Sequence, residues 1–277
     1  MKDIDWKCRY NSGEDNLIRD FFIPALSVSK YYYRIAGYFS STSIAAAFRG
    51  ISSFIETGEK MKLIVGNELS EMDIESIMRG NKKLDEVLLK KWEEIEKELE
   101  NDIVKNRFEL LAWLIANDKL EIKIGINIDK NGRYIPYNKS LFHEKVLIFE
   151  DEGHNRIQLD GSINETWSAW KNNRESFCVH KSWVEGQDEF ITSAKETFDM
   201  LWEDIDLHSR VINLPEAVKE KLIKQRPKNR PSLDESDFES EYVLEKKEEN
   251  KKLRKYQEEA IEAWINNEYI GILEMAT

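Results

Sequence analysis

The chain of 277 residues contains only two cysteines, Cys8 and Cys178, and they form no Cys-x-x-Cys pair. This scarcity argues against a disulfide framework and against a cysteine-based zinc site. No uninterrupted apolar stretch is long enough to cross a bilayer, and the first residues lack the apolar segment of a secretion signal. We therefore expect a protein of the reducing cytoplasm, with no membrane partner.

Basic residues are also in deficit, with 41 Lys and Arg against 53 Asp and Glu and a net charge of −12. Phosphate-binding surfaces draw most of their affinity from Lys and Arg, so this balance at first argues against a nucleic-acid partner. Residues 233–250, however, hold eight acidic and two basic residues and contribute half of that charge, whereas residues 219–230 hold six basic residues against one acidic. The charge is therefore patterned along the chain, and the objection weakens.

The hydrophobic and charged fractions, 41% and 34%, are typical of a globular protein. Period-two apolar patterns predict strands over residues 32–39, 62–66 and 120–127. Between them, a serine-rich cap precedes a helix ending near Thr57, and residues 71–117 have a helical pattern that breaks near Asn101 or Asn106. This order of elements predicts an α/β sheet with crossover connections.

The second half of the chain continues the pattern. We expect strands over residues 141–150, 156–160 and 176–180, a short helix over residues 165–170, and an amphipathic helix over residues 187–202. A turn-rich loop over residues 129–136 precedes the first of these strands. Three residues of the loop region could contact a substrate, although a plain connection is an equal alternative: Arg133, Tyr134 and Lys139.

The most informative motif lies in this half. In the expected strand over residues 141–150, His143 and Lys145 are two residues apart and so share a face. The next strand runs into Gly161-Ser162-Ile163-Asn164, where glycine permits a tight exit and a close approach of the backbone to a ligand. The sequence thus predicts a hairpin that delivers four polar side chains to one place.

These residue types suit phosphoryl chemistry. An imidazole can attack phosphorus when a carboxylate holds its other ring nitrogen, and Glu175 is the candidate carboxylate for His143. Lys145, Ser162 and Asn164 are donors suited to the non-bridging phosphate oxygens. This scheme needs no metal and no cofactor.

The ordered set His-x-Lys, Gly-Ser-x-Asn and a downstream glutamate resembles the signature of the phospholipase D superfamily. The resemblance implies a mixed β-sheet flanked by helices, with His143 as the nucleophile, Lys145, Ser162 and Asn164 as phosphate ligands, and Glu175 as the residue that orients the histidine. The chain departs from the family at Glu150, where an aspartate is usual and its role is structural. Because members work with two such motifs and this chain has one, a homodimer is expected to complete the site.

The remaining histidines and two tryptophans have simpler interpretations. His154 is expected in a solvated turn, His180 at the end of a strand and His208 among polar residues after a helix, none at metal-ligand spacing. Trp167 and Trp170 could stack on bases, but core packing is favoured.

The C-terminal stretch, residues 251–277, resembles the entry to a superfamily 2 helicase motor. Its Arg-x-Tyr-Gln element implies adenine contacts through Arg254 and Gln257, and ATP and Mg are expected only for a full-length motor. The chain stops where the phosphate loop would begin, so we expect a fragment or a truncation. An ordinary amphipathic helix followed by a strand is the alternative.

The resulting hypothesis has three parts: a phospholipase D-like nuclease domain over residues 1–210, a charged linker over 211–250, and the first helix and strand of a helicase motor over 251–277. Its predicted activity is metal-independent DNA endonuclease cleavage, through a phosphohistidine intermediate, in a helicase-nuclease of restriction or phage defence. Two alternatives remain: a phospholipase or phosphatidyltransferase, and a non-catalytic DNA-binding or dimerisation module of a helicase.

Overall fold

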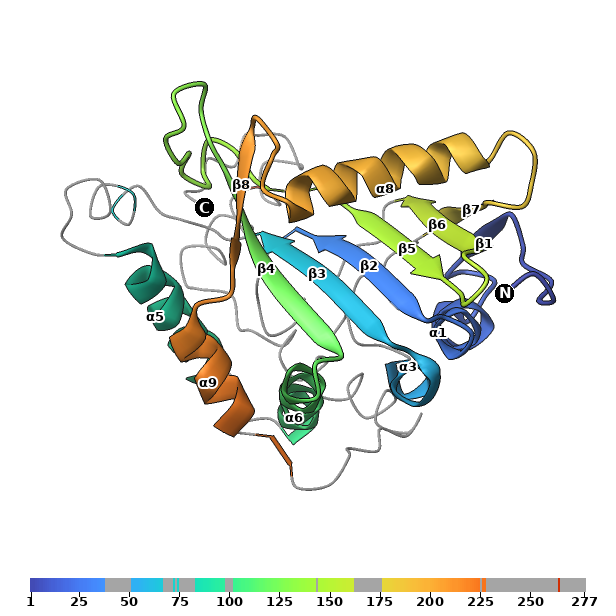
Figure 1. Cartoon of the computed structure of the whole chain (residues 1–277), viewed down its shortest axis with the longest axis horizontal. Helices are drawn as coiled ribbons and strands as arrows, with labels where there is room; N and C mark the ends of the chain where they lie inside the picture. The colour runs from blue at the N-terminus through green and yellow to red at the C-terminus, as the bar shows by residue number, and fades with distance from the viewer. Residues whose placement is uncertain are drawn as a thin grey trace. The chain divides into compact units, whose positions relative to one another are not determined.

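A computed structural model describes residues 1–37, 51–66, 72, 74, 83–97, 102–142, 144–161, 176–224, 226–227 and 264. The chain divides into two compact units, Met1–Asp234 and Glu235–Thr277, and the second is described only at Trp264. The first unit is a mixed eight-stranded sheet with helices packed on both faces (Figure 1). The predicted fold class is therefore confirmed for this unit, whereas the predicted helicase helix and strand lie outside the described residues, apart from Trp264.

The strands β2, β3 and β4 run parallel, and the other neighbouring pairs in this sheet are antiparallel. In their order across the sheet, the strands are β1 (Arg9–Asn11), β7 (Ser176–Lys181), β6 (Arg156–Gly161), β5 (Val146–Glu150), β2 (Tyr31–Ala36), β3 (Lys60–Gly66), β4 (Leu120–Asn127) and β8 (Ser209–Asn213). The helices of the described residues are the π-helix η1 (Ile18–Phe22), α1 (Ile23–Ser27), α3 (Ile51–Thr57), α5 (Leu84–Lys97), α6 (Asp102–Ala116), α8 (Asp188–Trp202) and α9 (Glu216–Lys224).

Helix α8 covers one face of the sheet (Figure 1). Its buried residues Ile191, Phe198, Leu201 and Trp202 follow helical spacing, which gives the helix a single apolar side. Three of them, Phe198, Leu201 and Trp202, join a cluster that includes Ile35 of β2. The amphipathic helix predicted over residues 187–202 is confirmed.

The opposite face carries the larger core. There Leu110, Leu111 and Leu114 of α6 are fully buried and pack in the same cluster as Leu63 of β3. Because helices cover both faces, central strands such as β5 are buried at every position instead of alternating between apolar and polar residues. In the helical region predicted over residues 71–117, α6 runs without interruption from Asp102 to Ala116, so a break near Asn106 is wrong. The alternative break near Asn101 falls on residues 98–101, which lie outside the described residues.

Residues 211–224 belong to the sheet unit and not to the predicted linker. Strand β8 pairs with β4, with Ile124 opposite Ile212, and α9 packs against α6. Both elements were missed because β8 is short and α9 is rich in lysine. A proline directly before the helix, Pro215, was a usable start signal that the linker interpretation overlooked.

The connection between α8 and β8 is held by Asp204, and we predict that it makes stability depend on pH. Arg210 donates to the Asp204 carboxylate through Nε at 3.0 Å and Nη2 at 2.6 Å, and the Val211 amide donates at 2.7 Å. Although partial burial acts to raise the pKa of Asp204, these hydrogen bonds outweigh it and hold the pKa below its ordinary value of 3.8. The stabilisation is therefore complete above that ordinary value and is lost as the pH falls through the lowered pKa.

Replacement of Asp204 by Asn tests this prediction, because asparagine also tolerates the left-handed backbone of this position, where φ is 55°. Urea unfolding at a series of pH values should show the wild type more stable than Asp204→Asn at pH 6, with the difference shrinking below about pH 4. A difference that is the same at pH 6 and pH 3 would contradict the assignment.

Candidate active site at the carboxyl end of the sheet

One end of the sheet collects a terminus of each of its eight strands. The parallel strands β2, β3 and β4 end there, and so do β1 and β6, whereas β5, β7 and β8 begin there. The register fixes the neighbours: Ile35 lies opposite Val146, Gly161 opposite Phe177, and Asn127 opposite Ser209. We call this region the carboxyl end of the sheet.

Every predicted catalytic residue is within three residues of one of these termini in the chain. Lys145 is described, is partly buried and directly precedes β5. The other four, His143, Ser162, Asn164 and Glu175, lie outside the described residues. Their chain neighbours are described: Phe142 and Glu144 flank His143, Gly161 directly precedes Ser162, and Ser176 directly follows Glu175.

The strand predicted over residues 141–150 is shorter than expected. Strand β5 begins only at Val146, and neither Leu141 nor Lys145 is in a strand, so a shared strand face does not explain the pairing of His143 with Lys145. The reason is the packing of Phe142, whose ring lies against Gly125 of β4. The segment before β5 thus crosses the ends of β3 and β4 and does not extend the ladder beside β6.

Two glycines make room for this crossing. A Cβ atom on Gly125 would lie 2.6 Å from the Phe142 ring, and one on Gly66 would overlap the Gly37 carbonyl oxygen and lie 2.8 Å from the Phe142 carbonyl oxygen. Gly66 and Gly125 are themselves paired across β3 and β4. Sequence reasoning treated both as ordinary strand residues, although glycine inside a strand is a signal of close backbone approach.

Gly161 is also a position of close approach, but to another strand. A Cβ atom there would lie 2.5 Å from the Ser176 carbonyl oxygen and 2.8 Å from the Phe177 Cα. The described contact is therefore with the backbone of β7, whereas the sequence interpretation expected a ligand. This close packing holds the residue before Ser162 against the residue after Glu175.

Two arginines near the carboxyl end of the sheet were not predicted. Arg34 of β2 is only 1% exposed, and its Nη1 donates to the Tyr32 hydroxyl at 3.2 Å. Arg9 of β1 donates to the Ser176 hydroxyl at 2.9 Å. The Arg34 guanidinium is therefore held inside the sheet unit, and the Arg9 guanidinium is held beside the start of β7. The signal for Arg34 was a charged residue inside an otherwise apolar strand.

The carboxylate beside His143 in the chain has an altered pKa. Partial loss of solvent around the Glu144 carboxyl raises its pKa, and the negative charge of Asp206 adds to that shift. Asp206 lies in the connection that leads to β8. Glu144 is two residues before β5 and Asp206 is three residues before β8, so both carboxylates belong to segments that enter the sheet at its carboxyl end.

Glu150 lies at the other end of β5, away from the candidate site. Glu150 is 3% exposed, and its Oε2 accepts a hydrogen bond from Arg156 Nε at 2.8 Å. Its Oε1 lies 2.7 Å from His154 Nδ1. These contacts tie the two ends of the β5–β6 turn together. The structural role expected at this position agrees with them, and His154 is exposed in the turn as predicted, in contact with Glu150, which the sequence did not reveal.

The other two histidines are also described. His180 lies in β7 and stacks on Phe190 of α8, with ring centroids 4.6 Å apart. His208 directly precedes β8, so it lies at the carboxyl end of the sheet, and its backbone carbonyl accepts a hydrogen bond from the Ile128 amide. Of the three histidines within the described residues, only His208 is at the same end as the motif.

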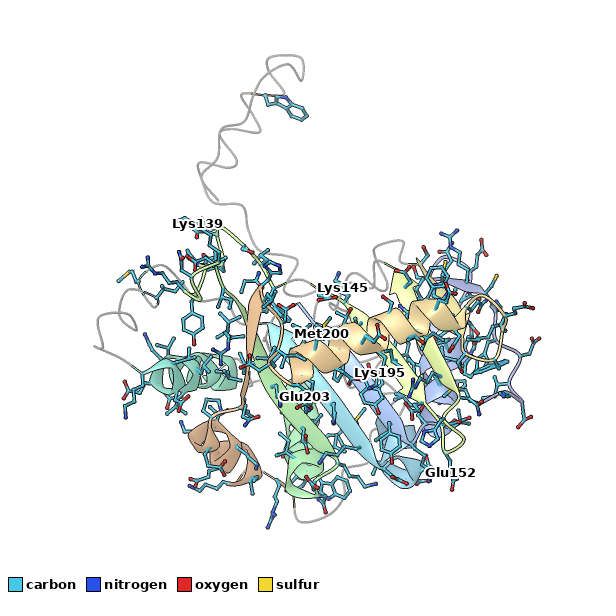
Figure 2. All side chains as sticks on the ribbon, turned by 45° about the horizontal axis from the view of Figure 1, so that its top comes forward. Lys139, Lys145, Glu152, Lys195, Met200 and Glu203 are labelled. Carbon is cyan, nitrogen blue, oxygen red and sulfur yellow. The ribbon has the colours of Figure 1, made fainter. Side chains whose placement is uncertain are left out.

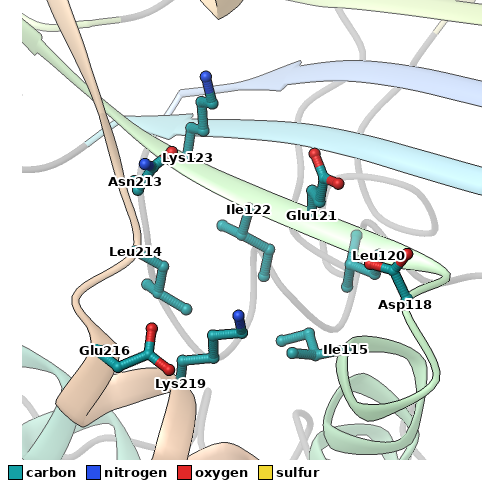
Figure 3. Close-up of a pocket in the computed structure, with 10 residues that line it drawn as sticks. All are labelled: Ile115, Asp118, Leu120, Glu121, Ile122, Lys123, Asn213, Leu214, Glu216 and Lys219. Carbon is teal, nitrogen blue, oxygen red and sulfur yellow. The ribbon is translucent and has the colours of Figure 1, made fainter.

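A cavity of about 300 Å³ lies elsewhere, at the amino end of β4 (Figure 3). Its floor is apolar, and the figure shows Lys219 of α9 extending across it beside Glu216. Because β4 enters the sheet here and leaves it at the carboxyl end, this cavity is not part of the candidate site. Within the described residues, no group of three or more His, Cys, Asp or Glu side chains could hold a metal ion.

The comparisons with known proteins agree with the geometry. A family model described as "Cardiolipin synthase, PLD-like domain" matches residues 22–202, a span that includes His143, Lys145, Ser162, Asn164 and Glu175. A search of curated proteins finds no significant match. In the part of the chain that the structure describes, no helix has the length and apolarity needed to span a membrane. Since the family model covers more than half of the 277 residues, the chain belongs to the phospholipase D-like family.

Proposed function

We propose that the protein is a metal-independent phosphodiesterase that cleaves DNA, with His143 as the nucleophile. The observation that carries the proposal is the register of three strands: the start of β5, the end of β6 and the start of β7 are adjacent at the carboxyl end of the sheet. Each of these termini is next in the chain to one part of the motif. The segments before β5, after β6 and before β7 are distant in sequence, and in this proposal they act together on one phosphate.

In the first step, the His143 ring nitrogen attacks phosphorus and forms an N–P bond as the P–O bond to the leaving group breaks. The leaving oxygen takes a proton from an acid. Glu175 accepts a hydrogen bond from the other ring nitrogen and stabilises the positive charge on the imidazole. Lys145, Ser162 and Asn164 donate to the non-bridging oxygens, whose charge must be held as the transition state forms.

In the second step, water attacks the phosphohistidine. The group that acted as the acid now accepts a proton from this water, the N–P bond breaks, and His143 is regenerated. The product is a phosphomonoester end. No step requires an atom outside the protein, the substrate and water.

We assign the acid to the His143 of a second copy of the chain, as in a two-fold dimer that places two motifs side by side. Among the described histidines, His208 is the alternative within one chain, because it lies at the same end of the sheet. The dimer assignment predicts that specific activity falls when the protein is diluted below its dimerisation constant, where sedimentation changes from twice 32.7 kDa to 32.7 kDa. Full activity in the monomer, together with inactivity of His208→Ala, would instead assign the acid to His208.

Two kinds of phosphodiester are candidate substrates for this site, a lipid and a nucleic acid. The description of the matching family model names cardiolipin synthase, and a lipid phosphodiester is therefore the second candidate substrate. The proposal of DNA follows from the resemblance of residues 251–277 to the start of a helicase motor, in which Arg254 and Gln257 would contact adenine. A helicase-nuclease of restriction or phage defence remains our proposal for the full-length context.

The test is hydrolysis in excess EDTA of single-stranded DNA, double-stranded DNA, bis(p-nitrophenyl) phosphate and phosphatidylcholine vesicles. We expect cleavage of DNA and of the small diester, with no dependence on added metal. Turnover of the vesicles without cleavage of DNA would move the assignment to the phospholipase class. Absence of turnover of all four substrates would leave the non-catalytic DNA-binding or dimerisation module as the better account.

A further inference from the structure

The connection between β4 and β5 is a defined hairpin and not a plain loop. We call residues 128–140 the β4–β5 hairpin. Ile128 and Tyr134 form an isolated bridge, the Asp129 amide donates to the Arg133 carbonyl at 2.8 Å, and the Ile135 amide donates to the Asn127 carbonyl at 3.0 Å. Figure 1 shows this segment in green, extending beyond the carboxyl end of β4 beside the start of β8.

The single carboxylate of the hairpin, that of Asp129, accepts hydrogen bonds within the turn. Asp129 Oδ1 accepts hydrogen bonds from the Asn131 amide at 2.8 Å and the Arg133 amide at 2.9 Å. The bond from Arg133 is the main cause of the lowered pKa of Asp129, and the bond from Asn131 adds to it. Gly132, with φ of +74°, completes the turn. A carboxylate held by backbone amides shapes the turn, so the outward charge of the hairpin comes from its basic side chains.

Those basic side chains stand out in an acidic chain. The hairpin contains Lys130, Arg133 and Lys139 against Asp129, which gives a net charge of 3 − 1 = +2 where the whole chain has −12. Lys130 and Arg133 are exposed, and Tyr137 is 45% exposed. Figure 2 shows Lys139 on this projecting segment. The combination of exposed basic and aromatic side chains fits a nucleic-acid strand, which offers both phosphates and base faces.

The last residue of the hairpin is fastened to β4, and through β4 to the start of β8. Asn127 Nδ2 donates to the Ser140 hydroxyl at 2.8 Å, and the Ser209 hydroxyl donates to Asn127 Oδ1 at 3.2 Å. Ser140 is three residues before His143 in the chain. The orientation of the hairpin is therefore coupled to the end of the sheet where the reacting phosphate would lie.

We propose that the β4–β5 hairpin is a nucleic-acid contact, in which Lys130 and Arg133 neutralise backbone phosphates next to the scissile one and Tyr137 stacks on a base. This inference rests on the proposed function, since it names the substrate class of the same site. A polymer carries further phosphates and bases beyond the reacting group and gains from such contacts, whereas a single lipid headgroup offers no base on which Tyr137 could stack. The tip, Lys130-Asn131-Gly132-Arg133, has no apolar side chain that could insert into a lipid surface.

The test compares Lys130→Ala/Arg133→Ala with Lys224→Ala/Arg226→Ala, a control that removes the same charge from exposed positions at and beyond the end of α9. Affinity for a fluorescent single-stranded DNA is measured by anisotropy at several salt concentrations. The hairpin variant should bind about tenfold more weakly, and the slope of log K against log salt should become shallower by about 1.4, since each lost contact on a single strand removes about 0.7. The control should bind like the wild type. Equal affinity of the two double variants would overturn the proposal.

The stacking contact has its own pair of variants. Tyr137→Ala should weaken DNA binding about tenfold, and Tyr137→Phe, which keeps a ring, should restore most of it. Anionic phosphatidylglycerol vesicles are tested in parallel, and loss of vesicle binding without loss of DNA binding in the hairpin variant would contradict the nucleic-acid assignment. Turnover of bis(p-nitrophenyl) phosphate is measured separately, so failure of the catalytic proposal is distinguished from failure of the binding proposal.

Discussion

Replacement of His143 by Ala lowers the hydrolysis of bis(p-nitrophenyl) phosphate by at least about 10³-fold, because the residue that forms the covalent intermediate is removed. The expected loss is in kcat, since Lys145, Ser162 and Asn164 remain to bind the phosphate oxygens. Steady-state kinetics in excess EDTA, with the variant and the wild type at equal concentration, measures the effect.

The matched control is His154→Ala. This substitution also removes one imidazole, but from the turn at the opposite end of β5, where the histidine contacts Glu150. We expect the control to retain wild-type kcat, and circular dichroism should show both variants folded. A His143→Ala protein with more than a tenth of wild-type activity would reject His143 as the nucleophile.

Gly66→Ala should damage both stability and activity. An added methyl group would overlap the Gly37 carbonyl oxygen and press on the Phe142 carbonyl oxygen, and neither backbone atom can move independently of its strand or segment. Overpacking of this kind costs about 1–3 kcal/mol. Because Phe142 is bonded to His143, we also expect kcat to fall on the order of 10²-fold, as for a small misplacement of a reacting group.

Urea unfolding and steady-state kinetics measure the two effects of Gly66→Ala. Gly153→Ala is the control, because the nearest atom to an added Cβ is the end of the Asn155 side chain at 3.0 Å, with no backbone atom in the way, in the turn at the opposite end of the sheet. It should change neither quantity appreciably. If Gly66→Ala unfolds like the wild type and keeps its kcat, then the seating of Phe142 does not position the candidate site.

The strands that carry the site were predictable because their apolar patterns are strong. Strand β4 matches the predicted bounds, residues 120–127, and β6 and β7 extend one residue beyond theirs. Strand β5 was overextended at its start, since the alternation of apolar and polar residues around Phe142 continues through a segment that leaves the ladder. Apolar periodicity reports burial, and Phe142 is buried by packing against Gly125 and the core cluster under α8, not by pairing in the sheet.

The chemical residues of the candidate site stay a prediction from the sequence, made because Lys145 and its four companions form an ordered set whose side chains suit phosphoryl transfer. The contacts that support this end of the sheet could not be predicted in that way. Arg9 reaches Ser176 only through the pairing of β1 with β7, and residues 9 and 176 are far apart in the chain. A contact of this kind depends on the sheet order, which the local pattern of one sequence does not determine.

The central claim, a covalent phosphohistidine at His143, is tested most directly by trapping that intermediate. The protein is mixed with DNA or bis(p-nitrophenyl) phosphate in EDTA, quenched in alkali to preserve the acid-labile N–P bond, digested and analysed by mass spectrometry. We predict a phosphoryl adduct on the peptide containing His143, absent from His143→Ala. An adduct on another residue, or turnover without any adduct on His143, would contradict the account.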